Sequence, residues 1–242
     1  MNTAQLAEGL VSWIKDRVAA AGGKGVVLGL SGGVDSSVAA VLCQRAFPQN
    51  TLAVLMPCYS NQEYMAHARM VAEKFAIPTR TVALDSVFDG LLKVLPEDKA
   101  DPDVSRLAQA NIKARLRMLT LYYFANRLKY IVVGAGNRDE LSIGYFTKYG
   151  DGGVDIMPIG NLVKKEVIEL AIFLDIPQPI IGKPPSAGLW PGQTDEGEMG
   201  ITYKELDRYL LSGEATTETR KKIETRLAVC LHKRSTPPIA EI

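Results

Sequence analysis

The sequence has few cysteines and histidines and almost no net charge. Three cysteines and two histidines occur in 242 residues, and no two cysteines form a C-x-x-C pair. A zinc ribbon or a disulfide framework is therefore not expected, and reduced thiols in the cytoplasm are the simpler prediction. Lysine and arginine total 28 against 27 acidic residues, a formal charge of +1. This balance argues against a dedicated nucleic-acid-binding surface.

Long apolar runs are also missing, so no membrane-spanning helix is expected. At the N-terminus Leu6, Leu10, Ile14 and Val18 recur every four residues with charged residues between them. This spacing predicts an amphipathic helix rather than a signal peptide. We find no internal repeat, low-complexity tract or linker, and we expect a single domain over residues 1–242. A chain of this length can bury a core without a disulfide or a structural metal.

Short apolar runs alternate with helical patterns along the first half of the chain. This alternation predicts an α/β fold with a doubly wound, mostly parallel sheet and helices on both faces. The expected strands cover residues 26–30, 51–56, 79–84 and 130–133, and the expected helices cover residues 38–47, 63–75, 111–128, 164–174, 203–211 and 218–231. The glycine-rich segment 144–153 and the segment 182–200, rich in proline and glycine, are expected to be loops.

The strongest local pattern is LGLSGGVDSSVAAVL, residues 28–42. A loop of small residues between a strand and a helix exposes backbone N–H groups, and the helix dipole adds partial positive charge there. Gly32 and Gly33 let an anion approach the backbone, and the serines of the loop add hydroxyl donors. Asp35 would repel a bare polyphosphate, so we interpret it as a Mg²⁺ ligand. A serine-rich helix cap without a ligand would need neither the glycine pair nor the acidic residue.

The loop lacks the Walker A pattern and resembles the SGG-x-DS loop of the ATP pyrophosphatase (PP-loop) superfamily. This resemblance implies an adenine nucleotide alpha hydrolase-like (Rossmann-like) fold and cleavage of ATP between its α and β phosphates. Longer stretches are similar to the signatures of the NAD synthetase family. They are NIKARLRM (residues 111–118), GYFTKYGDGGVDIMPIGNLVKKEV (144–167), KPPSAGLWPGQTDEGEMGITYKELDRYL (183–210) and the terminal HKR (232–234).

The family resemblance implies a ligase that amidates nicotinic acid adenine dinucleotide (deamido-NAD) to NAD, with ATP and ammonia as the other substrates. The reaction would pass through an acyl-adenylate and release AMP and pyrophosphate. A glutaminase domain with its own cysteine nucleophile does not fit beside the synthetase region, so we expect free ammonia as the nitrogen donor. A separate glutaminase subunit stays open. The resemblance also implies a homodimer, and a cytoplasmic location is expected. The N-terminal helix and the helix over residues 111–128 are candidate interface elements, although core packing explains their apolar faces equally well.

The resemblance assigns roles to individual residues of this chain. Asp35 and Glu140 would bind Mg²⁺ and, together with Lys164, carry catalysis. Ser186 stands where the family usually has threonine, and its hydroxyl is expected to serve in the same contact. The implied ATP-binding residues are Gly29, Leu30, Ser31, Gly32, Gly33, Val34, Asp35, Ser36, Lys164 and Ser186. The implied deamido-NAD-binding residues are Arg115, Lys148, Asp155, His232 and Lys233.

The sequence also departs from the family pattern and leaves alternatives open. Ala135 replaces a threonine that contacts ATP in many relatives, and residues 57–62 lack an arginine that some relatives place near adenine, so backbone groups of residues 54–56 are expected to take over. Glu140 and Arg115 have a simpler alternative as solvated surface groups, and residues 232–234 as cations complementing the C-terminal dipole of a preceding helix.

Two other functions compete with the ligase. One is a different PP-loop enzyme, acting on XMP or on tRNA, although thiolation of tRNA would require paired reactive cysteines or a tRNA-binding extension. The other is a non-catalytic ATP-binding sensor, which would need neither Glu140 nor the loop of residues 144–155.

Overall fold

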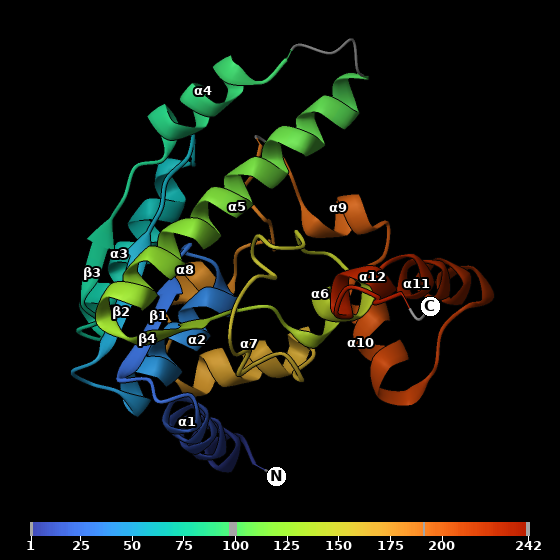
Figure 1. The fold of residues 1–242 in the computed structure, drawn as a ribbon. Helices are drawn as coiled ribbons and strands as arrows, with labels where there is room; N and C mark the ends of the chain where they lie inside the picture. The colour runs from blue at the N-terminus through green and yellow to red at the C-terminus, as the bar shows by residue number, and fades with distance from the viewer. Residues whose placement is uncertain (1, 97–100, 191, 241–242) are drawn as a thin grey trace.

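A parallel sheet forms the centre of the computed structural model, which describes residues 2–96, 101–190 and 192–240 (Figure 1). Its strands follow the order β3-β2-β1-β4. All three pairings in this sheet are parallel, as predicted, and Val27 of β1 lies beside Leu52 of β2 and Val132 of β4. The strand order reverses at β1, so a ligand is expected beyond the carboxyl ends of β1 and β4. The bounds are β1 (Gly25–Gly29), β2 (Thr51–Leu55), β3 (Thr79–Thr81) and β4 (Tyr130–Val133).

One face of the sheet is covered by helices from both halves of the chain. Leu28 of β1 and Leu55 of β2 belong to a buried cluster with side chains of these helices. Ile14 and Val18 of the first helix are buried in the same cluster, so the apolar face of this helix is used for core packing. The helices that contribute to this cluster are α1 (Thr3–Ala20), α2 (Val34–Ala46), α3 (Gln62–Lys74), α7 (Lys164–Phe173) and α8 (Gln178–Ile181).

The opposite face packs against α4 (Asp85–Val94) and α5 (Pro102–Leu128). Side chains alternate between the faces of a strand, and Val27 accordingly points away from Leu28 and contacts this second cluster. The cluster includes Leu121 of α5 and Phe88 of α4. The prediction of helices on both faces of the sheet is therefore confirmed.

A third buried cluster lies beside the sheet and belongs to the C-terminal helices. Ile143, Leu206 and Ile223 form its centre. Helix α10 contacts both α6 and α7, which joins this cluster to the sheet layers. The helices here are α6 (Arg138–Ile143), α9 (Asp195–Met199), α10 (Tyr203–Ser212), α11 (Thr217–Val229) and α12 (Leu231–Arg234).

Helix starts are where the sequence prediction was least accurate. Helix α2 begins at Val34 rather than at residue 38, because Gly33 in extended conformation already occupies the N-cap position. Helix α5 begins at Pro102 rather than at residue 111, with the Asp101 side chain accepting from the Asp103 N–H at 2.8 Å. Both α4 and α6 were not predicted.

Two further segments differ from the prediction. Strand β3 is only three residues long instead of six, and it lies at the edge of the sheet. The expected loop 182–200 includes the short helix α9, whose N-cap is Thr194. His232, Lys233 and Arg234 follow α11, as expected, and they are themselves part of the short helix α12.

Cys43, Cys58 and Cys230 are free and buried. Among the helices of the described residues, none combines the length and apolar character needed to cross a membrane.

Candidate active site

The loop between β1 and α2 is held in place by its own hydroxyl groups. The Ser36 and Ser37 hydroxyls both donate to the Gly33 carbonyl, at 3.0 and 2.7 Å. The Ser31 hydroxyl accepts from the Gly33 N–H at 3.2 Å. The serines therefore stabilise the turn itself, in addition to any role toward a ligand. Gly32 has a positive φ of 84°, and a Cβ there would lie 2.2 Å from the Tyr64 carbonyl oxygen, so only glycine fits.

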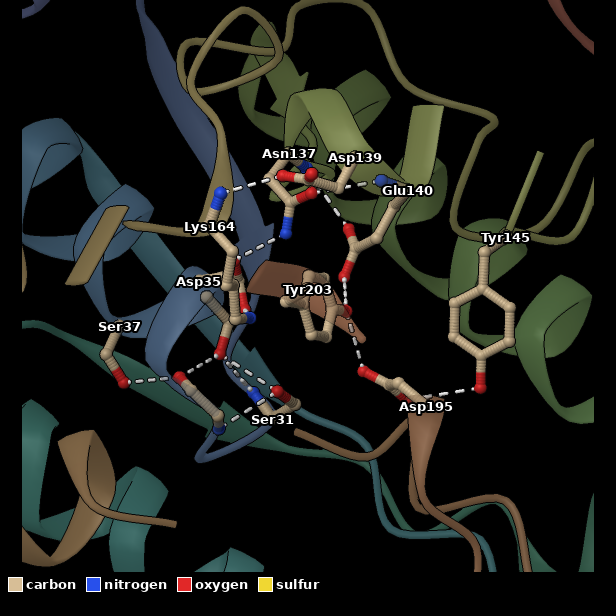
Figure 2. A network of polar contacts seen from close by, with 12 residues as sticks. Ser31, Asp35, Ser37, Asn137, Asp139, Glu140, Tyr145, Lys164, Asp195 and Tyr203 are labelled. Carbon is tan, nitrogen blue, oxygen red and sulfur yellow. Dashed lines mark hydrogen bonds and ion pairs between the residues drawn. The ribbon is translucent and has the colours of Figure 1, made fainter. Parts of the chain in front are cut away.

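Asp35, in the first turn of α2, connects this loop to two distant segments (Figure 2). Its Oδ2 lies 2.5 Å from the Lys164 Nζ, and its Oδ1 accepts from the Asn137 Nδ2 at 3.0 Å. Burial by itself would lower the pKa of Lys164, but the charges of Asp35 and Glu140 outweigh it and raise the pKa. Lys164 is therefore a charged ammonium in the site.

Glu140 faces the same centre from α6 (Figure 2). It forms a capping box with Asn137, in which its Oε2 accepts from the Asn137 N–H at 3.1 Å. The Tyr203 hydroxyl lies 3.4 Å from its other oxygen. Burial, and after it the charge of Asp35, raises the pKa of Glu140 well above its usual range. Two carboxylates and one ammonium thus meet at the start of α2. The negative charges outnumber the positive charge, so a further cation would balance them.

Lys164 is positioned by two carboxylates that the sequence did not single out. Its backbone N–H donates to Asp139 at 2.7 Å and to Asp207 at 3.1 Å, and the Lys165 N–H donates to Asp207 at 3.1 Å. The two acids therefore cap the N-terminus of α7. Burial and the neighbouring Asp207 raise the pKa of Asp139 to about 7.

A third buried acid, Asp195, extends the network away from the loop (Figure 2). It accepts from the Tyr203 hydroxyl at 2.9 Å and from the Tyr145 hydroxyl at 3.1 Å. The Tyr145 hydroxyl also lies 2.5 Å from Glu198. Burial raises the pKa of Asp195. Sequence reasoning missed Asp195 because its segment was expected to be a loop without a defined partner.

Asp35, Glu140, Lys164 and Asp195 line one cavity of about 590 Å³. The cavity begins at the carboxyl ends of β1 and β4, where the fold predicts a ligand. We refer to the loop 31–37 with Asp35, Glu140 and Lys164 as the phosphate end. The predicted ATP-site and metal residues that line the cavity are Gly29, Leu30, Ser31, Gly33, Val34, Asp35, Ser36, Glu140, Lys164 and Ser186, whereas Gly32 packs behind the loop.

Two of the backbone carbonyls expected to contact adenine already accept hydrogen bonds from other groups of the protein. Val54 and Met56 line the cavity, as does Ala135. The Val54 carbonyl already accepts from the Leu30 N–H at 3.1 Å, and the Met56 carbonyl accepts from Arg117 at 3.2 Å. Adenine recognition by carbonyls of residues 54–56 stays a prediction.

The five predicted deamido-NAD-binding residues, which we call the dinucleotide cluster, are less enclosed. Lys233 lines the cavity and donates to the carbonyls of Gly144 and Phe146, both at 2.7 Å. Lys148 donates to the His232 carbonyl at 2.5 Å, and the Arg115 guanidinium lies 3.4 Å from the Lys148 carbonyl. These contacts join Arg115, Lys148 and His232, which lie outside the residues that line the cavity.

Asp155, the fifth member of the dinucleotide cluster, lies elsewhere. Its carboxylate accepts from the Val132 N–H at 2.8 Å and from the Tyr122 hydroxyl at 2.9 Å. It is therefore anchored at the end of β4 and also lies outside the cavity lining. The structure thus brings the phosphate-end residues together at the cavity, whereas Lys233 is the member of the dinucleotide cluster found among the described residues that line it.

Comparison with known proteins gives consistent matches over the whole chain. A family model described as NAD synthase matches residues 6–237. The NH(3)-dependent NAD(+) synthetase of Carboxydothermus hydrogenoformans is 48% identical over 239 residues, which cover 99% of this chain and 98% of that protein.

Among solved structures, the NMN synthetase from Francisella tularensis aligns with a TM-score of 0.93 and 34% identity, with both chains covered completely. The NH3-dependent NAD synthetase from Campylobacter jejuni, in complex with the nitrate ion, aligns with a TM-score of 0.81 and 29% identity, again over both complete chains.

Proposed function

This chain belongs to the NAD synthase family, and we propose that it amidates deamido-NAD to NAD with ATP and ammonia. One observation carries the proposal. The loop 31–37, Asp35, Glu140 and Lys164 converge at one end of a cavity, in a chain that matches ammonia-dependent NAD synthetases over almost its full length. ATP is the co-substrate, and AMP and pyrophosphate leave. We further propose one domain over residues 1–242 and a cytoplasmic location.

The arrangement supports adenylation followed by amide formation. A carboxylate oxygen of the substrate attacks the α-phosphorus of ATP, the bond from that phosphorus to the bridging oxygen breaks, and the electron pair leaves with pyrophosphate. The amides at the start of α2 and the ammonium of Lys164 offset negative charge on the departing group. Ammonia then attacks the acyl carbon, AMP leaves, and the nitrogen loses a proton. Positioning of the reactants and electrostatic stabilisation account for the rate acceleration, and no covalent nucleophile is required.

The donor set at the phosphate end fits Mg²⁺. Asp35 and Glu140 supply carboxylate oxygens, and Mg²⁺ is usually held by one or two carboxylates together with substrate phosphates. The raised pKa of Glu140 reflects its burial and the nearby charge of Asp35, which a cation between them would relieve. Magnesium held by Asp35 and Glu140 would supply positive charge that offsets the charge of the phosphates.

We propose that the dinucleotide cluster recognises the acid substrate and that a second protomer completes this region. Support comes from α5, which carries Arg115 and also exposes apolar side chains. Leu119 is 63% exposed and Tyr123 54% exposed on this helix. The α1 helix, the other candidate, buries its apolar face in the core instead. A homodimer through α5 would cover this exposed surface.

Amidation of the corresponding mononucleotide is a second candidate. The observation that favours it is the TM-score of 0.93 to the NMN synthetase from Francisella tularensis. Both reactions would use the same phosphate end. They differ in the acceptor, because deamido-NAD carries an adenylate half that must be bound and the mononucleotide does not. The dinucleotide cluster provides a binding surface for that half.

The test measures AMP release from ATP and Mg²⁺ with each acid acceptor, with ammonium chloride or glutamine as the nitrogen source. We expect AMP and NAD to form together with deamido-NAD and ammonium, and not with glutamine. A ratio of kcat/KM that favours the mononucleotide would establish the second candidate. AMP release with XMP alone would place the chain in another PP-loop activity, and the absence of acceptor-dependent AMP would support an ATP-binding sensor.

A further inference from the structure

Lys183 has a buried ammonium group with no hydrogen-bond partner in the described part of the chain. It follows α8, at the start of the segment that leads to Ser186, and its side chain is 16% exposed. Its Nζ lies 3.2 Å from the centroid of the Tyr64 ring. The nearest carboxylate is that of Glu63, at 3.5 Å, and the Glu63 side chain is 58% exposed to solvent. An ammonium held this way retains donors for a ligand.

Tyr64 places Lys183 next to the phosphate end of the cavity. Its carbonyl oxygen lies directly behind Gly32 in the loop, where a Cβ would be only 2.2 Å away. Its ring packs against Gly188, where a Cβ would be 2.7 Å from the ring carbon Cε2. Tyr64 is therefore held between the loop and the segment that carries Lys183. Lys183, Ser31 and Gly33 line the same cavity.

The other cations of the cavity lining already have partners. Lys164 is paired with Asp35, and Arg117 donates to the Met56 carbonyl and to Ser60. Arg226 donates to the Glu198 carbonyl, and Lys233 donates to two carbonyls. Among the described residues that line this cavity, Lys183 is the cation whose donors are not engaged in a hydrogen bond.

The phosphate end has an excess of negative charge that a polyphosphate would increase. The loop 31–37 contains no basic residue, and Lys164 faces Asp35, Glu140 and Asp195. Among the chain's own groups, pyrophosphate leaving this site would therefore meet more carboxylate than ammonium charge. A second ammonium close to the loop would correct this balance, and Lys183 is suitably placed.

We propose that Lys183 binds the β and γ phosphates of ATP and holds pyrophosphate as it leaves. The ammonium moves from the Tyr64 ring to phosphate oxygens when the nucleotide enters. This assignment rests on the proposed use of ATP by this site. The competing explanation is that Lys183 only anchors its segment to Tyr64 through a cation–π contact.

The first experiment compares Lys183→Met and Lys183→Arg with the wild type. We expect Lys183→Met to weaken inhibition by pyrophosphate and to raise KM for ATP by about 10-fold or more, as loss of a charge-assisted hydrogen bond predicts. Lys183→Arg should stay within about threefold of the wild type. Inhibition by AMP and KM for the acid acceptor should not change. Lys222→Met, which removes an exposed lysine paired with Glu218, is the matched control.

An anchoring role makes different predictions. If Lys183 only held its segment, Tyr64→Leu would reproduce the effect of Lys183→Met, and AMP and pyrophosphate would lose inhibition equally. Unchanged inhibition by pyrophosphate in Lys183→Met, with normal folding, would also overturn the proposal.

A second measurement separates this proposal from the proposed function. Calorimetry of Mg²⁺–pyrophosphate binding needs no acid acceptor. Binding by the wild type that Lys183→Met loses supports Lys183 even if neither acceptor is amidated. Amidation by both proteins with equal pyrophosphate affinity would reject Lys183 and retain the proposed function.

Discussion

The phosphate end and the dinucleotide cluster are built in different ways. At the phosphate end Asp35, Asn137 and Lys164 contact one another through side chains that are largely buried. In the dinucleotide cluster Arg115 and His232 are exposed, and the contacts run mainly to backbone carbonyls. The first region is therefore pre-organised by the chain, whereas the second requires the substrate or another protomer to complete it. Substitutions should affect chemistry at one end and affinity at the other.

The largest effect is expected for Asp35→Asn. The substitution removes the charge that pairs with Lys164 and one of the proposed metal ligands. We expect AMP formation to fall by at least about 10³-fold, because electrostatic groups at the reacting centre are lost. Single-turnover AMP release measures this, and circular dichroism checks the fold. Asp103→Asn, an exposed acid paired with Arg106, should be neutral. Near-normal turnover of Asp35→Asn would refute the proposed role of this carboxylate.

A smaller loss is expected for Asp139→Ala. Asp139 accepts from the Lys164 N–H and so fixes the first turn of α7. Loss of this cap should destabilise the protein by about 1–2 kcal/mol and lower kcat by about 10- to 100-fold through misplacement of Lys164. Thermal unfolding and steady-state kinetics measure the two effects. Asp139→Asn keeps an acceptor oxygen and should retain most of the activity. Equal losses in both variants would show that the charge, rather than the cap, is required.

Substitutions in the dinucleotide cluster should raise KM for the acceptor and leave kcat unchanged. For Arg115→Ala we expect KM for deamido-NAD to rise by about 10-fold while KM for ATP stays constant, because the residue lies outside the cavity lining. Initial-rate kinetics with each substrate varied tests this. Arg208→Ala, which removes an exposed arginine of α10 paired with Glu214, is the control. A fall in kcat with unchanged KM would remove the distinction between the two regions.

The smallest change in activity is expected for Leu119→Asp, which places a charge on the exposed face of α5. If a second protomer covers this face, the variant should sediment as a monomer at micromolar concentration and lose several-fold in acceptor affinity, because burying an unpaired charge opposes association. Val229→Asp, at a position 71% exposed on α11, serves as the control. An unchanged sedimentation coefficient for Leu119→Asp, or a fully active wild-type monomer, would contradict the proposed dimer.

The accuracy of the sequence prediction depended on whether the residues of a site lie close together in the chain. The loop 31–37 was predictable because glycines, serines and an acid lie together in one short segment between a strand and a helix. Lys164 and Glu140 depended on the family resemblance. Asp139, Asp207 and Asp195 were missed because their contacts to Lys164 and Tyr145 connect segments far apart in the chain, and no local pattern encodes such a contact.

Some of the missed features had a local signal. The start of α5 at Asp101 and Pro102 combines an N-cap side chain with proline in the first turn, which is a usual helix start. Asn137 and Glu140 form a capping box that indicated α6. The short strand β3 and helix α9 depend on tertiary packing, so the sequence pattern could not determine their bounds.

The capping of α7 by Asp139 and Asp207 also links parts of the fold that have separate cores. Asp207 belongs to α10 in the C-terminal cluster, while α7 packs against α1 and α2 beside the sheet. The amide protons of Lys164 and Lys165 are thus held by a carboxylate from the neighbouring cluster. Opening of the C-terminal helices would expose these two amides to deuterium exchange before the rest of α7, so their protection measures how cooperatively the two clusters unfold.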